Sequence, residues 1–335
     1  MNCFKKVVLA AIACFAVACP VSAQSVIKFA TLAPEGSTWM KVMKTFQADV
    51  EKNTAGRVKF KMFAGGVQGD EKDVLRKIRL GQLQSGGFTG VGIGEAAAKL
   101  RVMDSPFLFK TSEEVDFINK SYDAEFRKYL EEGGFVLLGW ADVGFVYLMT
   151  NTPVYAPQDL KKTKMWIWEG DPIAEAAFKY IGISPVPLSI TDVMTSLQTG
   201  LVNGVYGSPL SVVALQWYSR VKYMFGLPIA NAAGAVLVSK KAFDKLSPED
   251  QKILLDLGAT HFARLSSLSR QDNKSAIATL KKEKITVTEP SSPEVTARFE
   301  AMGLEARKSL AGKLFPAELL ERIEKSLAAF RAKAK

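Results

Sequence analysis

The 335-residue chain is poor in the side chains that most often perform catalysis or bind transition metals. It contains one histidine, His261, and three cysteines, Cys3, Cys14 and Cys19, all near the N-terminus. Removal of that N-terminal segment would leave no disulfide, no thiol nucleophile and no thiolate metal ligand. His261 lies in an expected long helix without catalytic partners nearby, so we expect it on the helix surface. The sequence therefore predicts no enzyme, no transition-metal site and no cofactor.

Long hydrophobic runs are also missing after the N-terminus, and none there could form a membrane-spanning helix. Residues 1–23 have the pattern of a secretory signal peptide, in which two lysines precede a short apolar run and a small-residue cleavage site. We expect cleavage after Ala23 and a periplasmic location. The remaining length is sufficient for two α/β domains.

An excess of positive charge is present, with 44 Lys and Arg against 34 Asp and Glu, a net charge of +10. The basic residues are spread along the chain and do not form clusters with aromatic residues, as nucleic-acid-binding proteins often do. We therefore expect no nucleic-acid partner.

Residues 159–218 alternate between strand and helix patterns. A strand pattern places Trp166 and Trp168 on one face, and Asp171 then caps the helix that follows. This β-α-β-α order predicts a parallel sheet covered by helices, and ligands of such sheets bind beyond the carboxyl ends of the strands. The two tryptophans therefore predict an aromatic wall on a ligand cleft.

Two motifs have weaker alternatives. Gly92-x-Gly94-x-x-Ala97 imitates a dinucleotide fingerprint, but the helix after it is cut short before Pro106, so we expect a cleft-lining loop. Glu169 and Asp171 are the first candidates for a calcium or sodium site, although a turn and a helix cap explain both residues more simply.

Segments in a fixed order resemble the DctP-type solute receptors of TRAP (tripartite ATP-independent periplasmic) transporters over nearly all of the chain after residue 23. The matching segments are 28–30, 69–70, 105–109, 150–154, 159–165, 185–187 and 196–204. This resemblance implies an α/β protein with a mostly parallel sheet in each of two domains and a hinged interdomain cleft. We expect domain I at 24–142 plus 233–274, and domain II at 143–232 plus 275–335. The resemblance also implies a membrane permease of small and large subunits as partner.

The chain departs from the family where the resemblance implies a ligand clamp. The arginine that clamps the ligand carboxylate is replaced by Trp166, a second arginine is missing near Phe145 and Val146, and a common asparagine appears as Ser208 before Pro209. Arginine offers a charged bidentate fork, whereas tryptophan offers a large apolar area. We therefore predict a hydrophobic or amphipathic cargo. Further wall candidates by position are Leu32, Phe88 and Thr89.

Other interpretations stay open at this point. A receptor for a small organic acid would use Lys164, Thr89 or Ser208 as polar anchors. A secreted enzyme and a lipid shuttle without a permease are two further alternatives. The missing clamp is also similar to a receptor subgroup associated with a tetratricopeptide-repeat protein, a possible second partner.

Overall fold

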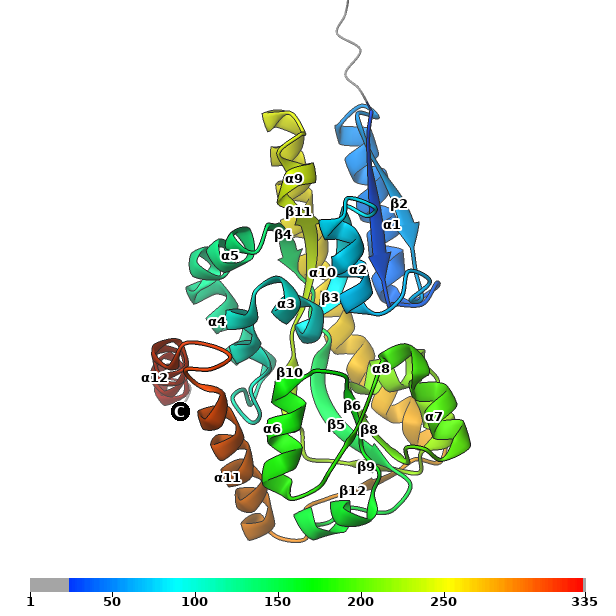
Figure 1. Ribbon diagram of the computed structural model, residues 1–335, viewed down its shortest axis with the longest axis vertical. Helices are drawn as coiled ribbons and strands as arrows, with labels where there is room; N and C mark the ends of the chain where they lie inside the picture. Colours follow the sequence, from blue (N-terminus) through cyan, green and yellow to red (C-terminus); the bar gives the residue numbers. More distant parts are fainter. Residues whose placement is uncertain (1–23, 334–335) are drawn as a thin grey trace, which may run out of the picture.

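The computed structural model describes residues 24–333, which form two α/β halves arranged along the long axis of the molecule (Figure 1). The upper half contains a five-stranded sheet of order β2-β1-β3-β11-β4. β11 runs antiparallel to β3 and β4, while the other four strands share one direction. The strands are β1 (Ser25–Thr31), β2 (Val58–Phe63), β3 (Ser85–Thr89), β4 (Phe135–Trp140) and β11 (Gly234–Ser239).

Helices cover both faces of this sheet. The first is a typical amphipathic helix: Ser37 accepts a hydrogen bond from the Met40 amide at its start, and Met43, Phe46 and Val50 are buried along one stripe. Two consecutive helices follow Thr111, which caps the first of them by accepting a hydrogen bond from the Glu114 amide. The helices of this half are α1 (Thr38–Asn53), α2 (Glu71–Arg79), α3 (Gly90–Ala96), α4 (Ser112–Ser121), α5 (Asp123–Glu132) and α9 (Lys240–Phe243).

The lower half is built around β5 (Gly144–Thr150), which pairs antiparallel with β8, β9 and β10, so the strands around it share one direction. An isolated bridge from Met165 to Gly204 attaches the short β6-β7 ladder to β8. The other elements are β6 (Trp166–Trp168), α6 (Pro172–Ile181), β7 (Val186–Leu188), α7 (Val193–Thr199), β8 (Gly204–Gly207), α8 (Pro209–Ala214), β9 (Tyr223–Phe225), β10 (Ala230–Ala232) and β12 (Thr286–Thr288).

The chain passes between the halves at several places. It crosses after β4, returns after β10, and crosses again in α10 (Pro248–Lys282), which packs on α1 and β4 above and on α8 below. α11 (Pro293–Leu310) then lies against α6, and α12 (Ala317–Lys333) against α4 (Figure 1). The two-domain α/β architecture is confirmed, and both sheets are mixed, because β11 in the upper sheet and β5 in the lower one run antiparallel to their neighbours. The domain boundaries stay a prediction.

The prediction that His261 lies on a helix surface is wrong. Its side chain is buried, its Nε2 lies 2.8 Å from Asp49 Oδ2, and its ring meets the Phe46 ring edge-on. The reason is that α10 is packed between α1 and β4, so a helix that seemed exposed has little free surface there.

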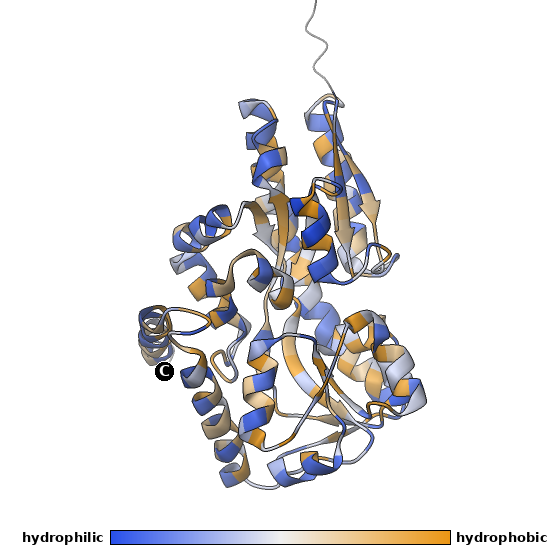
Figure 2. Ribbon diagram, viewed as in Figure 1, coloured by the Kyte–Doolittle hydropathy of each residue, from blue (hydrophilic) through white to orange (hydrophobic). Residues whose placement is uncertain are grey.

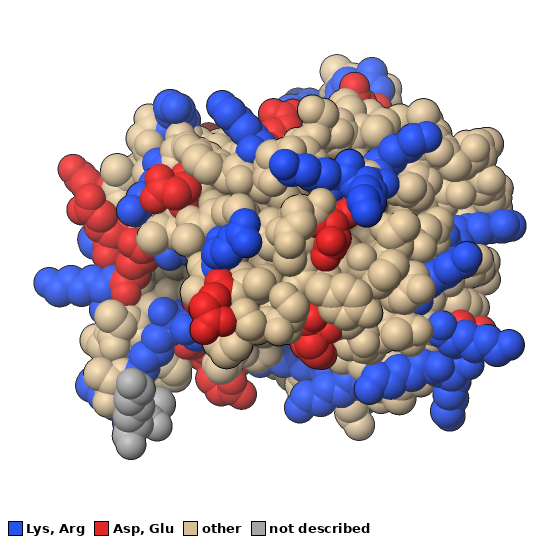
Figure 3. Space-filling view, turned by 90° about the horizontal axis from the view of Figure 1, so that it is seen from below, with Lys and Arg blue, Asp and Glu red and all other residues tan. Residues whose placement is uncertain are grey.

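Apolar residues gather in the two sheets and on the helix faces that cover them (Figure 2). At one end of the molecule, Lys and Arg side chains alternate with acidic ones over much of the face, while few acidic side chains lie among the Lys and Arg at its lower right edge (Figure 3). No helix between residues 24 and 333 combines the length and apolar character that crossing a membrane requires. The predicted signal peptide lies outside the described residues.

Candidate ligand-binding cleft

A cavity of about 420 Å³ lies between the two halves. The upper half contributes the segments after β1 and β3, and the lower half contributes β6, α6 and the junction of β8 with α8. Most of its lining is apolar, and its volume falls within the range of about 300–1,000 Å³ typical of small-molecule sites.

The structure brings most of the predicted wall residues to this cavity. These are Leu32, Phe88, Thr89, Val146, Trp166, Trp168 and Ser208. Phe145 and Pro209 are not among the lining residues that the structure describes. Phe145 packs instead against the core of the upper half, because successive residues of β5 point to opposite faces and Val146 takes the side of the cavity.

Trp166 lies at the centre of an aromatic cluster beneath the cavity. Its ring stacks on Tyr206 with centroids 5.0 Å apart, meets Trp217 edge-on at 5.4 Å and lies 6.0 Å from the Trp168 ring. Its Nε1 donates a hydrogen bond to the Leu188 carbonyl at 3.0 Å. With 1% of its surface exposed, Trp166 offers a ligand little area, and its main role is to hold the wall together.

The polar anchors suggested for an organic acid are already engaged. The Thr89 hydroxyl donates to Glu71 Oε2 at 2.9 Å, and the Ser208 hydroxyl shares a hydrogen bond of 2.9 Å with Ser211. Lys164 Nζ donates to the Gly200 carbonyl and is not among the lining residues described. Each of the three side chains thus has a protein partner, and Lys164 lies outside the described lining.

A buried charged cluster, which the sequence did not reveal, lines one part of the cavity. Arg101 Nη2 donates to Asp171 Oδ1 at 2.6 Å, and Arg101 Nε lies 3.5 Å from Asp104 Oδ2. Asp104 also accepts from the Ala233 amide, at 2.9 Å. Burial raises the pKa of Asp104 to about 6, although the positive charge of Arg101 opposes that rise.

Glu71 adds a third carboxyl group to the lining. It accepts hydrogen bonds from the amides of Thr89 and Gly92, both at 2.7 Å, in addition to the Thr89 hydroxyl. Burial raises the pKa of Glu71 to about 7, even though these hydrogen bonds favour its charged form. Tyr206 joins the cluster from below, because its hydroxyl lies 3.4 Å from Asp171 Oδ2.

The glycine motif forms a helix, so the expectation of a loop is wrong. Thr89 caps α3, and Gly90 and Val91 line the cavity. A side chain at Gly90 would overlap the Asp104 carboxyl group, and one at Gly94 would overlap the Arg101 stem. The glycines thus make room for buried charged side chains and not for a nucleotide.

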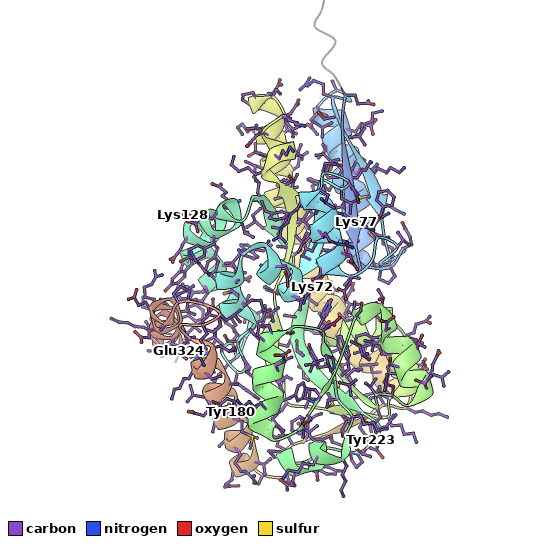
Figure 4. All side chains as sticks on the ribbon, viewed as in Figure 1. Lys72, Lys77, Lys128, Tyr180, Tyr223 and Glu324 are labelled. Atoms are coloured by element: carbon purple, nitrogen blue, oxygen red, sulfur yellow. The ribbon has the colours of Figure 1, made fainter. Side chains whose placement is uncertain are left out.

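The loop before α6 connects the two halves. Lys72 of α2 lies at their boundary, where its Nζ donates to the Glu169 carbonyl at 2.7 Å (Figure 4).

Asp171, the other candidate for a calcium or sodium site, is paired with Arg101. Among residues 24–333 no group of three or more His, Cys, Asp or Glu side chains could hold a metal ion.

Comparison with known proteins agrees with this architecture. The family "Bacterial extracellular solute-binding protein, family 7" (DctP) matches residues 29–312. A solute-binding protein of Verminephrobacter eiseniae is 28% identical over 79% of this chain and 80% of its own. A TRAP periplasmic solute-binding protein of Ochrobactrum anthropi has a similar structure, with a TM-score of 0.80, 24% identity, and coverage of 93% of this chain and 97% of its own.

The sugar acid-binding protein DctPAm of Advenella mimigardefordensis, solved with galactonate, has a TM-score of 0.86 at 22% identity and covers 92% of this chain and 99% of its own. These likenesses concern the fold. The family is one of periplasmic transport receptors, whose partners are a small-molecule ligand and a membrane permease. The chain belongs to the DctP family, the solute receptors of TRAP transporters.

Proposed function

We propose that this TRAP receptor captures a hydrophobic or amphipathic small molecule in the cavity between its halves and delivers it to the permease. The observation that carries the proposal is the cavity itself, about 420 Å³ in volume with a mainly apolar lining. Burial of an apolar ligand there is favoured by roughly 25 cal/mol for each Å² removed from water.

The charges of the lining support the same cargo. Arg101 is the one cationic residue in the described lining, against Glu71, Asp104 and Asp171. Its guanidinium is already paired with Asp171. A ligand carboxylate would therefore enter a site whose carboxyl groups outnumber its cations, beside a guanidinium whose charge Asp171 already balances.

A small organic acid is the second candidate cargo. The presence of Arg101 in the lining favours it, as does the galactonate bound by the Advenella protein. This candidate requires Arg101 to exchange its protein partner for the ligand. A tetratricopeptide-repeat partner and cleavage after Ala23 stay predictions.

Native mass spectrometry of the receptor purified without added ligand tests the cargo. We expect a co-purifying mass that organic solvent extracts and that behaves as an apolar or amphipathic compound. Ala177→Phe narrows the cavity and should remove that mass, whereas Ala328→Phe, on the exposed face of α12, should retain it. Recovery of a small polar acid from the unmodified receptor would favour the second candidate.

A further inference from the structure

The ion pair of Arg101 joins the two halves of the receptor. Arg101 lies in a short 3₁₀ helix of the upper half, and Asp171 caps α6 of the lower half. They are 5% and 4% exposed, so the pair is almost fully removed from water. A buried carboxylate thus lies against Arg101, the one arginine in the part of the cavity lining that the structure describes.

The surroundings of the pair hold it in place. Asp171 Oδ1 also accepts the Ile173 amide at 3.0 Å, which is the helix-capping hydrogen bond of α6. Asp104 lies on the other side of the guanidinium, 3.5 Å from Nε. Both acids are therefore anchored to backbone amides, Asp171 through Ile173 and Asp104 through Ala233.

The chain leaves space for this arrangement in α3. Side chains at Gly90 and Gly94 would overlap Asp104 and Arg101, and one at Gly92 would come within 2.7 Å of Glu71 Oε2. Three glycines on one short helix each face a different member of the charged cluster. The cluster is consequently part of the packing of α3.

We propose that Asp171 is a built-in counter-ion that neutralises Arg101 in place of a ligand carboxylate, so that the pocket selects cargo without an ionised carboxyl group. This inference rests on the proposed function and names the ligand class more narrowly. A carboxylate ligand beside Arg101 would meet the negative charge of Asp171, which already balances the guanidinium, or would have to displace Asp171 and leave that buried charge unpaired. A ligand with an alcohol, amide or ether group adds no negative charge beside Asp171.

Asp171→Asn tests the counter-ion because asparagine keeps the capping acceptor and removes the charge. The probes are benzoate and its uncharged isostere benzamide, measured by titration calorimetry on receptor freed of co-purified ligand. We expect unmodified receptor to bind benzamide at least tenfold more tightly than benzoate. Asp171→Asn should strengthen benzoate binding at least tenfold, and Arg101→Gln/Asp171→Asn should abolish that gain.

Asp171→Ser, which also retains a capping acceptor, repeats the test if the asparagine variant does not fold. Unchanged benzoate affinity in a folded Asp171 variant would overturn the inference. The inference would also be overturned if the unmodified receptor bound benzoate tightly and Arg101→Gln removed that binding. The proposed function is tested separately, by the compound that co-purifies with the unmodified receptor. The counter-ion inference is tested by the change in benzoate affinity between variants.

Discussion

The carboxylate of Asp70, at the start of α2 in the upper half, accepts a hydrogen bond from the indole Nε1 of Trp168 in the lower half at 2.9 Å. The same carboxylate accepts the Ser189 hydroxyl at 2.6 Å and the Ile190 amide at 3.1 Å. It also caps α2 through the Glu71 amide. One buried side chain therefore links three groups of the lower half to a helix of the upper half.

We expect Asp70→Asn to open the cleft. Asparagine keeps the helix cap but weakens the hydrogen bonds to Trp168 and Ser189, and one hydrogen bond to a charged group contributes about 1.5–3 kcal/mol. The equilibrium constant for closure should fall by about 10- to 100-fold. Single-molecule FRET measures this, because the chain after residue 23 has no cysteine and accepts unique labels at exposed positions through Leu80→Cys and Leu201→Cys.

Asp73→Asn is the matched control for this experiment, since Asp73 lies on the same helix and pairs only with Arg76 in the described structure. It should leave the FRET distribution unchanged. Equal distributions for Asp70→Asn and unmodified receptor would mean that Asp70 does not hold the halves together.

Trp166→Ala should lower the free energy of unfolding by about 3–5 kcal/mol, the usual cost of removing a large buried aromatic side chain. The substitution removes the stack on Tyr206 and leaves the Leu188 carbonyl without its donor. Urea unfolding followed by circular dichroism measures the loss. Tyr180→Ala, at a partly exposed position of α6 (Figure 4), should cost less than about 1 kcal/mol. Similar costs for the two variants would show that Trp166 is not the centre of the cluster.

Much of the fold was predictable because periodic patterns depend on local sequence. The largely apolar run at residues 26–30 lies in β1, and Met43, Phe46 and Val50, which are spaced for one face of a helix, form the buried stripe of α1. Trp166 and Trp168 could be placed at the cleft because a strand before a helix ends at the ligand edge of a sheet.

The charged cluster could not be predicted in the same way. Arg101 lies in a 3₁₀ helix without an amphipathic pattern, and its partner Asp171 is 70 positions further along the chain. The glycines at 90 and 94 indicate that other groups come close to α3, but the sequence does not show that these groups are Asp104 and Arg101 of the following segment. His261 was misplaced for a similar reason, since only the packing of α10 against α1 buries it.

Glu71 should make the receptor less stable as the pH rises. Its pKa is raised by burial from 4.5 to about 7, so the folded state retains a proton that the unfolded state loses between these values. The resulting loss of unfolding free energy is absent below pH 4.5, grows between pH 4.5 and pH 7, and is complete above pH 7, where it amounts to roughly 3 kcal/mol. Asp104, with a pKa raised to about 6, adds to the same trend.

Glu71→Gln should therefore flatten the decline of unfolding free energy between pH 5 and pH 8, measured by urea titration at each pH. The Gly92 amide loses its acceptor in this variant, which lowers stability by a similar amount at every pH, so the slope is the informative quantity. Glu131→Gln, at an exposed position of α5, should keep the slope of the unmodified receptor. A Glu71→Gln slope equal to that control would show that Glu71 is ionised throughout.

Gly90→Ala provides a test of how α3 and the charged cluster fit together. Alanine is the better helix former by up to about 1 kcal/mol, so an open position would gain stability. Here the new Cβ would overlap the Asp104 carboxyl group, which is fixed by the Ala233 amide, and we expect a loss of about 1–3 kcal/mol. Gly207→Ala is the control, because its Cβ would meet its nearest neighbours at 3.8 Å, an ordinary contact distance. Urea unfolding of both variants decides the point, and a Gly90→Ala receptor as stable as the unmodified one would mean that Asp104 does not lie against α3.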